Sequence, residues 1–314
     1  MNLKRISVLK AIEKNNIISQ RELANKIGIS LGSVNNIINY LNENEYILKT
    51  IINNKAKYEV LHKGYEEIKN SYVKTAVILA AGLGSRLYDI TNNKIHKSFL
   101  YVFNDTLIER SIKILLKNNI KKIIIVTGHL SDSFEGLKEK YPMIETIRNE
   151  KFENTGSMAS LAIAADLIDD KDFLLLESDL IYEKRAIEYL QETDKKNCIL
   201  LSGKTNSGDE VYVEIKNNSI YKMSKDTHSL KNIYGELVGI SKISKDLLHN
   251  MIEEYKKSTN SQYHYEYAIE DVCERYIVEY KKIDDLIWGE IDDSNHLKRI
   301  NNKIIPKLKD KNEI

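Results

Sequence analysis

The segment from residue 76 to residue 87, AVILAAGLGSRL, constrains the fold of this chain most strongly. Its first half is an apolar run that predicts a buried β-strand, and the run passes directly into a loop with Gly82 and Gly84. Two glycines let the backbone approach an anion closely, so that loop amides and the charges of Arg86 and Lys97 can neutralise phosphate oxygens. The segment therefore predicts a polyphosphate site, although glycines after a strand also form simple tight turns.

Apolar runs alternate with helical stretches after residue 74. The apolar runs cover residues 122–128, 172–178 and 198–203, and the helical stretches include residues 105–119 and 158–168. This alternation is typical of βαβ units and a mostly parallel sheet. We therefore expect residues 74–314 to form a doubly wound, Rossmann-like α/β domain, with its ligand at the carboxyl ends of the strands.

The first 70 residues have a different character. Residues 1–70 carry 11 lysines and arginines against 7 aspartates and glutamates, whereas the remainder has an excess of acidic residues, so two domains with different partners are expected. Helical patterns at 4–14, 20–28 and 31–45 precede strand-like runs at 46–52 and 55–61 and a last helix at 62–73. Asn53 and Asn54 suit the turn of a hairpin. The order helix, helix, turn, helix, hairpin predicts a small winged-helix domain over residues 1–70.

The phrase SQRELANKIGISLGSVNNIINYL, residues 19–41, resembles the helix-turn-helix of bacterial regulators. In that family the third helix enters the major groove of DNA and the hairpin touches the backbone. The resemblance implies that bases face Ser30, Ser33, Asn35 and Asn36, and that phosphates lie near Lys49, Lys55 and Lys57. Winged helices also pack or dimerise, and the positive charge here is modest for DNA binding, so both interpretations stay open.

The phrase LAAGLGSR, with Lys97 following it, resembles the signature of nucleotidyltransferases that make nucleotide-activated sugars and alcohols. It is not a Walker A loop, and Leu87 stands where a dinucleotide-binding motif has its third glycine. The resemblance implies that Arg86 holds the departing β- and γ-phosphates and that Lys97 lies over the α-phosphate as catalytic residues. The implied nucleotide-binding residues of the loop are Leu79, Ala80, Ala81, Gly82, Gly84 and Ser85.

Two aspartates are candidate metal ligands. Asp179 follows the apolar run 172–177, where an aspartate can also be a helix cap or a turn former, and Asp292 lies in the phrase WGEIDDSNHL. The same resemblance implies that both bind Mg²⁺, a cation that prefers a few carboxylates together with phosphate oxygens and water. Neighbouring Asp293 is expected to point to the opposite face of a strand.

The phrases KFENTGSMASLAIAADLI, LLLESDLIYE and YGELVGISKIS narrow the resemblance, over residues 75–305, to the phosphocholine and 2-aminoethylphosphonate cytidylyltransferases. This implies Mg²⁺-dependent transfer of CMP from CTP to a small phosphorylated alcohol or phosphonate, with phosphocholine as first choice and 2-aminoethylphosphonate as second. It also implies that Asn154, Ser157 and Ser160 lie near the nucleotide. Two alternatives stay open: a sugar-1-phosphate nucleotidyltransferase, and a transcriptional regulator that senses a nucleotide-activated metabolite.

A cationic acceptor needs aromatic faces or carboxylates, and residues 262–271, QYHYEYAIED, offer both. Tyr265, Glu266 and Tyr267 are the candidates, although a stripe of tyrosines also suits packing and this chain has 19 of them. A phosphate acceptor is already ionised near neutral pH, so no general base is required, and His96 is predicted to be an exposed loop residue.

Composition predicts a cytoplasmic protein without membrane insertion. No apolar run approaches the roughly 20 residues that span a bilayer, and the N-terminal segment is too charged for a signal peptide. Cys198 and Cys273 lack a C-x-x-C spacing and are expected to be buried thiols. The sequence leaves the oligomeric state open.

Overall fold

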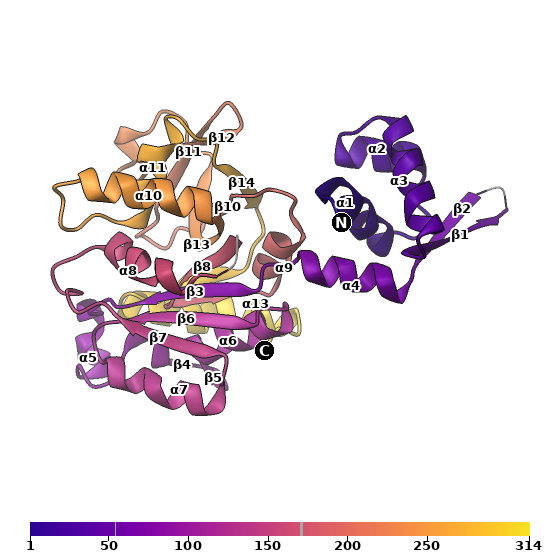
Figure 1. Ribbon diagram of the computed structural model, residues 1–314. Helices are drawn as coiled ribbons and strands as arrows, with labels where there is room; N and C mark the ends of the chain where they lie inside the picture. Colours follow the sequence, from indigo (N-terminus) through magenta and orange to yellow (C-terminus); the bar gives the residue numbers. More distant parts are fainter. Residues whose placement is uncertain (54, 170–171) are drawn as a thin grey trace. The chain divides into compact units, whose positions relative to one another are not determined.

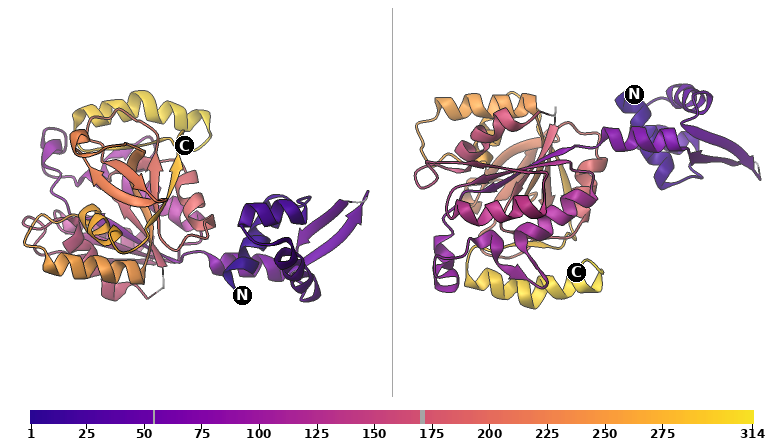
Figure 2. Two further views of the ribbon diagram at one scale, coloured as in Figure 1. Left: turned by 90° about the horizontal axis from the view of Figure 1, so that it is seen from above. Right: turned by 60° about the horizontal axis from the view of Figure 1, so that its bottom comes forward.

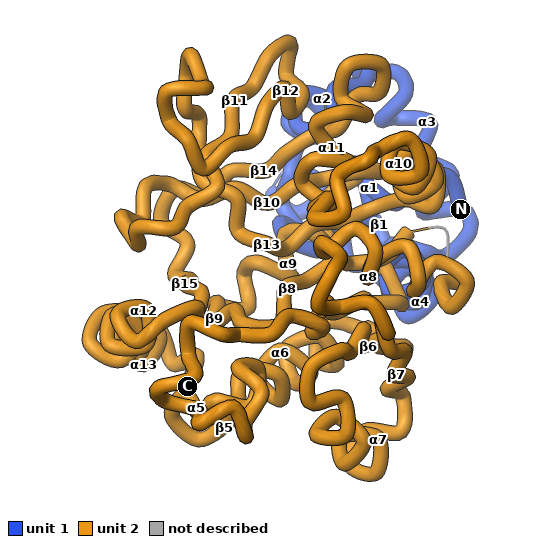
Figure 3. The backbone as a smooth tube through the Cα atoms, turned by 90° about the vertical axis from the view of Figure 1, so that its left-hand side faces the viewer, with its two compact units in different colours: residues 1–72 blue, residues 73–314 orange. Residues whose placement is uncertain are grey.

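The computed structural model describes residues 1–53, 55–169 and 172–314, and these divide into two compact units, Met1–Tyr72 and Val73–Ile314 (Figure 3). Asn54, which the sequence predicts in the hairpin turn, lies outside the described residues. Within the described part of each unit, no helix is both long enough and apolar enough to cross a bilayer.

The first unit is a winged helix (Figure 1). Its elements are α1 (Leu3–Lys14), α2 (Gln20–Ile27), α3 (Leu31–Glu43), the antiparallel strands β1 (Ile47–Ile52) and β2 (Lys55–Val60), and α4 (His62–Ser71). Ser19 caps α2 in a capping box with Glu22, Gly28 ends that helix in the left-handed conformation, and Ser30 caps α3. The helices enclose an apolar core that includes Leu9, Ile12, Leu23, Val34, Ile38 and Leu41. The predicted order of elements is confirmed.

The second unit is built on a sheet that has nine strands in the described residues. They are β3 (Thr75–Ala80), β6 (Lys122–Thr127), β7 (Ile144–Arg148), β8 (Asp172–Glu177), β10 (Cys198–Ser202), β11 (Tyr212–Lys216), β12 (Ser219–Ser224), β13 (Gly235–Ser244) and β14 (Glu279–Ile283). The order along the sheet is β12-β11-β13-β8-β3-β6-β7, with β10 pairing β13 and β14. Pairing is parallel from β8 through β3 and β6 to β7 and antiparallel between β8 and β13. The predicted α/β fold is confirmed, with an antiparallel strand inserted between β8 and β10.

Helices cover both faces of this sheet (Figures 1 and 2). On one face lie α6 (Leu107–Lys117), α7 (Glu135–Lys140) and α9 (Arg185–Glu192), and on the other lie α8 (Ser157–Ala164), α10 (Lys245–Lys257) and α11 (Tyr265–Cys273). Successive side chains on a strand point to opposite faces of the sheet, so each strand contributes apolar residues to both cores. Val77 packs with the second set of helices and Ile78 with the first. The layers are those of a doubly wound fold.

A smaller substructure joins the C-terminal segment to the end of β8. Strand β9 (Leu180–Tyr182) pairs antiparallel with β15 (Trp288–Glu290), and Ile291 N donates to Asp179 O at 3.0 Å. Beyond β15 come α12 (Ser294–Arg299), a π-helical turn (Ile300–Ile304) and α13 (Ile305–Asp310), whose apolar side chains form a separate cluster with Leu87 and Ile181. This pairing brings Asp292 to the carboxyl end of β8, next to Asp179. The remaining short elements are α5 (Tyr88–Thr91), β4 (Tyr101–Val102), β5 (Asp105–Thr106) and the 3₁₀ turns Ser85–Leu87, Lys97–Phe99, Ser131–Phe134, Ala165–Leu167 and Thr227–Ser229.

Candidate active site

A cavity of about 400 Å³ opens at the carboxyl ends of β3 and β8. Four stretches of chain supply most of its wall: the loop after β3, the segment 152–160, the segment 209–211 and the start of α11. Of the predicted nucleotide-binding residues in the first loop, Leu79, Ala81 and Gly82 line the cavity. Ala80, Gly84 and Ser85 are not among the described residues that line it. Gly84 has φ +62°, so its part is to turn the backbone into the following 3₁₀ turn.

The predicted cations and carboxylates meet in this cavity. Lys97 Nζ donates to Asp292 Oδ1 at 2.8 Å and also to Asp179 Oδ2. Arg86 pairs with the other oxygen of Asp292, at 2.9 Å. Burial by itself lowers the pKa of Lys97, but the two carboxylates outweigh it and hold that pKa above its ordinary value. Residues from the β3 loop, the β8 end and the C-terminal substructure thus form one charged cluster.

Sequence reasoning missed two members of this cluster. Asp209 accepts from Arg86 at 2.9 Å and from Lys225 Nζ at 2.6 Å, and both Asp209 and Lys225 line the cavity. Lys225 comes directly after β12, so it stands at a strand end as Asp179 does. That position is a signal that could have been used. Asp209 lies in a loop, and only the tertiary fold brings it to Arg86.

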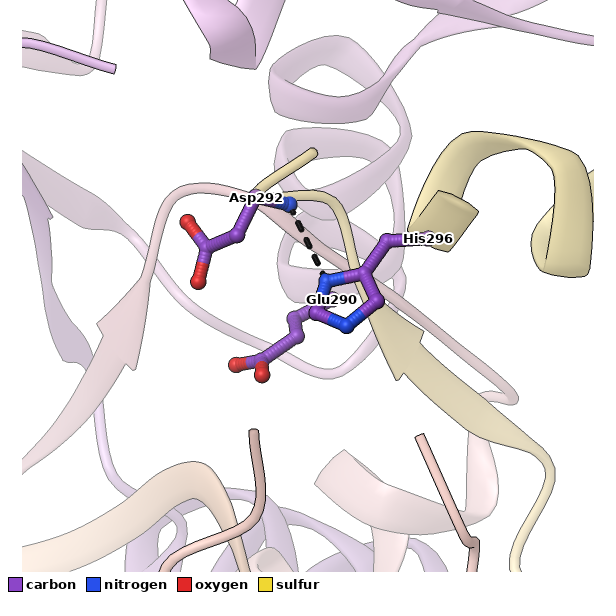
Figure 4. A group of neighbouring side chains, drawn as sticks. All are labelled: Glu290, Asp292 and His296. Atoms are coloured by element: carbon purple, nitrogen blue, oxygen red, sulfur yellow. Dashed lines mark hydrogen bonds between the residues drawn. The ribbon is translucent and has the colours of Figure 1, made fainter. Parts of the chain in front are cut away.

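The acidic side chains in the cluster and next to it fit a divalent cation. Asp179 is 7% exposed, and its Oδ1 has no hydrogen-bond partner among the described residues. Glu290, Asp292 and His296 each present one ligand atom within 4.8 Å of the others (Figure 4). Asp292 N donates to His296 Nδ1 at 3.4 Å. Carboxylate oxygens, one of them buried and unpaired, are suitable ligands for a hard divalent cation.

Asp293 is not on a strand, which differs from the prediction. β15 ends at Glu290, and the Asp293 carboxylate caps α12 by accepting from Asn295 N and His296 N, each at 2.8 Å. The cap engages Asp293 at the helix terminus, while neighbouring Asp292 faces Lys97.

More carboxylates than cations line the cavity. Burial and the charges of Asp179 and Glu266 raise the pKa of Glu177 to about 8, and burial raises the pKa of Glu266 to about 7. Burial and the charges of Asp179 and Asp292 raise the pKa of Glu290 to about 9. These shifts mean that the cavity favours binding of a further positive charge.

The prediction that His96 is exposed is wrong. It is 2% exposed and its ring packs edge-on against Phe134, with centroids 5.0 Å apart. Its Nδ1 accepts from Ser98 N at 3.2 Å. Burial, with neighbouring Lys97, lowers the pKa of His96 to about 3, so the imidazole is neutral. The 3₁₀ turn that starts at Lys97 folds this ring inward, which local sequence does not reveal.

Two of the three nucleotide-binding residues predicted on the segment 152–160 line the cavity, and the third does not. Ser157 and Ser160 line the cavity, whereas Asn154 is exposed and is not among the lining residues. The Ser157 hydroxyl accepts from Tyr265 N at 3.1 Å and lies 3.3 Å from His264 Nδ1, so it ties α8 to the start of α11. Further lining residues that the sequence did not single out here are Phe152, Glu153, Thr155 and Gly156.

Two of the three predicted acceptor-binding residues also line the cavity. Tyr265 and Glu266 line the cavity, but Tyr267 is 45% exposed and is not among the described lining residues. Tyr265 is itself 2% exposed, and its hydroxyl donates to Glu177 Oε1 at 2.6 Å. One oxygen of Glu266 is buried without a partner in the described chain. Tyr263 belongs to the apolar core, in agreement with the packing interpretation.

In the first unit, the residues predicted to face DNA lie at the start of α3 and on the hairpin. Asn35, Asn36, Lys55 and Lys57 are exposed, and Lys49 is half-buried. The Ser30 hydroxyl accepts from Ser33 N, and the two serine hydroxyls lie 2.8 Å apart. The serines therefore serve the helix cap, and the asparagines and the two hairpin lysines supply the exposed polar surface.

Comparison with known proteins adds to this geometry. Residues 75–212 match the nucleotidyl transferase family model, and residues 1–47 match a model of winged helix-turn-helix DNA-binding domains. A choline-phosphate cytidylyltransferase of Haemophilus influenzae is 37% identical over 132 residues, which are 42% of this chain and 54% of that protein. A 2-aminoethylphosphonate cytidylyltransferase of Lancefieldella rimae is 27% identical over 220 residues, 67% of this chain and 83% of that protein. The chain thus spans about half the length of the first relative and most of the second.

Two solved structures share the fold. The inositol-1-phosphate CTP transferase from T. maritima superposes with a TM-score of 0.66 at 18% identity, covering 76% of this chain and 96% of that one. The CTP:phosphocholine cytidylyltransferase from Streptococcus pneumoniae superposes with a TM-score of 0.62 at 20% identity, covering 73% and 98%. At these identities the likeness concerns the fold alone.

Proposed function

Because the chain carries a nucleotidyltransferase domain with cytidylyltransferases among its relatives, behind a winged helix-turn-helix domain, we propose that it transfers CMP from CTP to a small phosphorylated alcohol or phosphonate. Phosphocholine is the first choice of acceptor and 2-aminoethylphosphonate the second. The observation that carries the proposal is the meeting of Arg86 and Lys97 with Asp179 and Asp292 in one cavity at the strand ends.

In the proposed reaction an acceptor oxygen attacks the α-phosphorus of CTP in line. The new bond joins that oxygen to the α-phosphorus, and the bond from the α-phosphorus to the bridging oxygen breaks as pyrophosphate leaves. Both reactants are anions, so the work of the protein is to align and neutralise them. Arg86 and Lys97 supply positive charge to the nucleotide phosphates. Lys225, held beside Arg86 by Asp209, is placed to do the same for the acceptor.

We propose Mg²⁺ as the divalent cation, held by Asp179 and Asp292. When bound, it supplies positive charge to the α-phosphate and the incoming oxygen. The buried, unpaired Asp179 Oδ1 supports this assignment. No side chain is needed as a general base, since the acceptor is already ionised, and the neutral, buried His96 serves packing instead.

The part of the cavity wall that carries Glu177 and Glu266, here called the acidic wall, suits a positively charged acceptor headgroup. Glu266 presents a buried oxygen without a partner in the described chain, and Tyr265 fixes Glu177 beside it. We therefore assign acceptor recognition to Glu266 and Tyr265, and we leave Tyr267 out because it lies outside the cavity lining. This wall is the reason to prefer an amino alcohol over a neutral sugar.

A pyrophosphate-release assay tests the proposal. CTP, UTP, ATP and dTTP are each combined with phosphocholine, 2-aminoethylphosphonate and sugar 1-phosphates in the presence of Mg²⁺. Release with CTP and an amino-alcohol phosphate or phosphonate supports it. Release with UTP or dTTP and a sugar phosphate makes the protein a sugar nucleotidyltransferase. Nucleotide binding without any release indicates a metabolite-sensing regulator.

We further propose that the first unit binds DNA through α3 and the hairpin. The support is the match to winged helix-turn-helix domains and the exposed asparagines and lysines described above. CTP and DNA are both found inside cells, which agrees with the cytoplasmic location that the sequence predicts. Selection of binding sites from random duplexes tests this part, and failure to enrich any sequence would favour a packing or dimerisation module.

A further inference from the structure

One wall of the cavity is held by a residue that does not itself line it. Asn149 follows β7 and is 2% exposed. The segment that begins two residues later contributes Thr155 and Ser160 to the cavity lining. This wall lies next to the start of the β3 loop, because α8 packs on β3. In the proposed reaction the phosphates lie at Arg86 and Lys97 and the acceptor headgroup lies at Glu266. We assign this remaining wall, at Thr155 and Ser160, to the nucleobase.

The side-chain amide of Asn149 makes three hydrogen bonds. Its Oδ1 accepts from Lys151 N at 3.0 Å, and its Nδ2 donates to Thr155 Oγ1 at 3.0 Å and to Ser160 Oγ at 3.1 Å. Because a backbone N–H can only donate, the bond to Lys151 identifies the oxygen, and the nitrogen must face the two hydroxyls. Both N–H groups of the amide are therefore used.

These bonds also decide the direction of the hydroxyl protons. Thr155 gives its proton to Lys151 O at 2.9 Å, so toward Asn149 it is an acceptor. Ser160 likewise accepts from Asn149, and its own proton has no acceptor within the described part of the chain. Ser160 lines the cavity, so this proton is available to a ligand there.

The backbone around Asn149 leaves the wall little room to shift. Asn149 N donates to Thr127 O at 2.8 Å, at the end of β6. A Cβ at the neighbouring Gly128 would lie 2.6 Å from Phe152 Cβ, and one at Gly156 would lie 2.4 Å from Tyr263 O. The segment is thus packed closely at both ends, and the amide of Asn149 sets the position of what lies between.

We propose that Asn149 is a positioning residue that makes Ser160 a hydrogen-bond donor to the nucleobase and so favours cytosine over uracil. This inference rests on the proposed function. Cytosine presents N3 as an acceptor, whereas N3 of uracil carries a proton and would meet the Ser160 proton unfavourably. Loss of one such neutral hydrogen bond corresponds to roughly a tenfold change in relative affinity.

Equilibrium binding of CTP and of UTP to the full chain, by calorimetry with Mg²⁺ and no acceptor, tests this inference. Ser160→Ala and Asn149→Asp should each lower the CTP/UTP affinity ratio about tenfold. Asn149→Asp keeps the shape of the side chain but places a carboxylate oxygen against Thr155 Oγ1. Because both changes remove the same donor, the double variant should lose no more of the ratio than either single variant.

Asn197→Asp is the matched control. Asn197 is 4% exposed, its Oδ1 accepts from Ser244 N at 2.8 Å, and it does not line the cavity. This variant should lose thermal stability as Asn149→Asp does, with the CTP/UTP ratio unchanged. Should Asn149→Asp fail to fold, the CTP/UTP affinity ratio of Ser160→Ala still tests whether the Ser160 proton favours cytosine.

The outcomes separate the inference from the proposed function. An unchanged ratio in both Ser160→Ala and Asn149→Asp, with a wild type that prefers CTP, overturns the role of Asn149 and leaves the cytidylyltransferase proposal standing. A wild type that binds neither nucleotide, or that prefers UTP, overturns both.

Discussion

Replacing Lys97 with alanine should destabilise the second unit as well as stop turnover. Lys97 is the cation shared by Asp179 and Asp292, and the side chains of all three are at most 15% exposed. Removing one partner of a buried ion pair costs about 3–5 kcal/mol of unfolding free energy. Asp292 keeps Arg86 as a second partner, so we expect the lower end, about 3 kcal/mol. For a domain of this size that corresponds to a fall in melting temperature of roughly 6–12 °C.

The size of this loss should depend on pH. Burial raises the pKa of Asp292, but Lys97 and Arg86 outweigh burial and hold this pKa below its ordinary value. The stabilisation from this pairing is therefore present above the unfolded pKa of about 4, and it is lost as the pH falls further. The contribution of Lys97, whose folded pKa is raised, is present throughout this range. The gap in stability between wild type and variant should therefore be full at pH 7 and smaller at pH 3.

Calorimetric melting with a chelator present measures this gap, since a divalent cation could replace the missing charge. Lys94→Ala, an exposed lysine in the same loop, is the control and should melt like the wild type. Lys97→Arg should recover most of the stability. A Lys97→Ala variant that melts within about 2 °C of the wild type at pH 7, less than 1 kcal/mol for a domain of this size, would refute the reasoning that this cluster is a net stabilising pair.

Three other predictions concern function. Asp179→Asn should lose nearly all pyrophosphate release while its circular dichroism spectrum stays that of the wild type. The reason is that the amide removes a proposed carboxylate ligand but keeps the shape of the side chain. Normal release would exclude Asp179 from the proposed metal site. Residues 73–314 alone should keep cytidylyltransferase turnover in the same assay, because all the proposed catalytic side chains lie in that unit. A folded but inactive fragment would mean that the winged helix supports the site. In gel-shift titrations over a range of salt concentrations, Asn36→Ala should erase the preference for a selected duplex. Lys57→Ala should instead weaken binding to all duplexes about equally and reduce the salt dependence of binding. Equal effects of both changes on all duplexes would contradict recognition of bases by α3.

Local physical signals explain why much of the fold was predictable. The capping box of Ser19 with Glu22 and the left-handed Gly28 are decided by residues within one helix, so the start and end of α2 follow from sequence. The buried strand before Gly82 follows from its unbroken apolar run. The meeting of Lys97 with Asp179 and Asp292 was expected only because the motif resembles known enzymes. Spacing along the chain does not place residues 97, 179 and 292 together.

Long-range pairing explains what was missed. β13 lies between β8 and β10 although it follows both in the chain, and no local pattern specifies that insertion. Lys225 comes to the site because it follows β12, on the side of the sheet beyond β13. His96 looks polar and loop-bound in sequence, yet it fills a space beside Phe134 that only the folded chain creates.

The charge balance of the cavity links the proposed catalytic and acceptor sites. Asp179, Asp292 and Asp209 are already paired with Lys97, Arg86 and Lys225, so these three cations are engaged at the proposed phosphate end of the cavity. Glu177 and Glu266 have no cation partner among the described ion pairs, and burial raises their pKa values in that state. An acceptor with a positive headgroup would supply the missing charge, whereas a neutral sugar would leave two buried carboxyls to be neutralised by protons. Affinity for a cationic acceptor should therefore rise between pH 6 and pH 9 as these carboxyls ionise, and a pH-independent affinity would argue that the headgroup binds elsewhere.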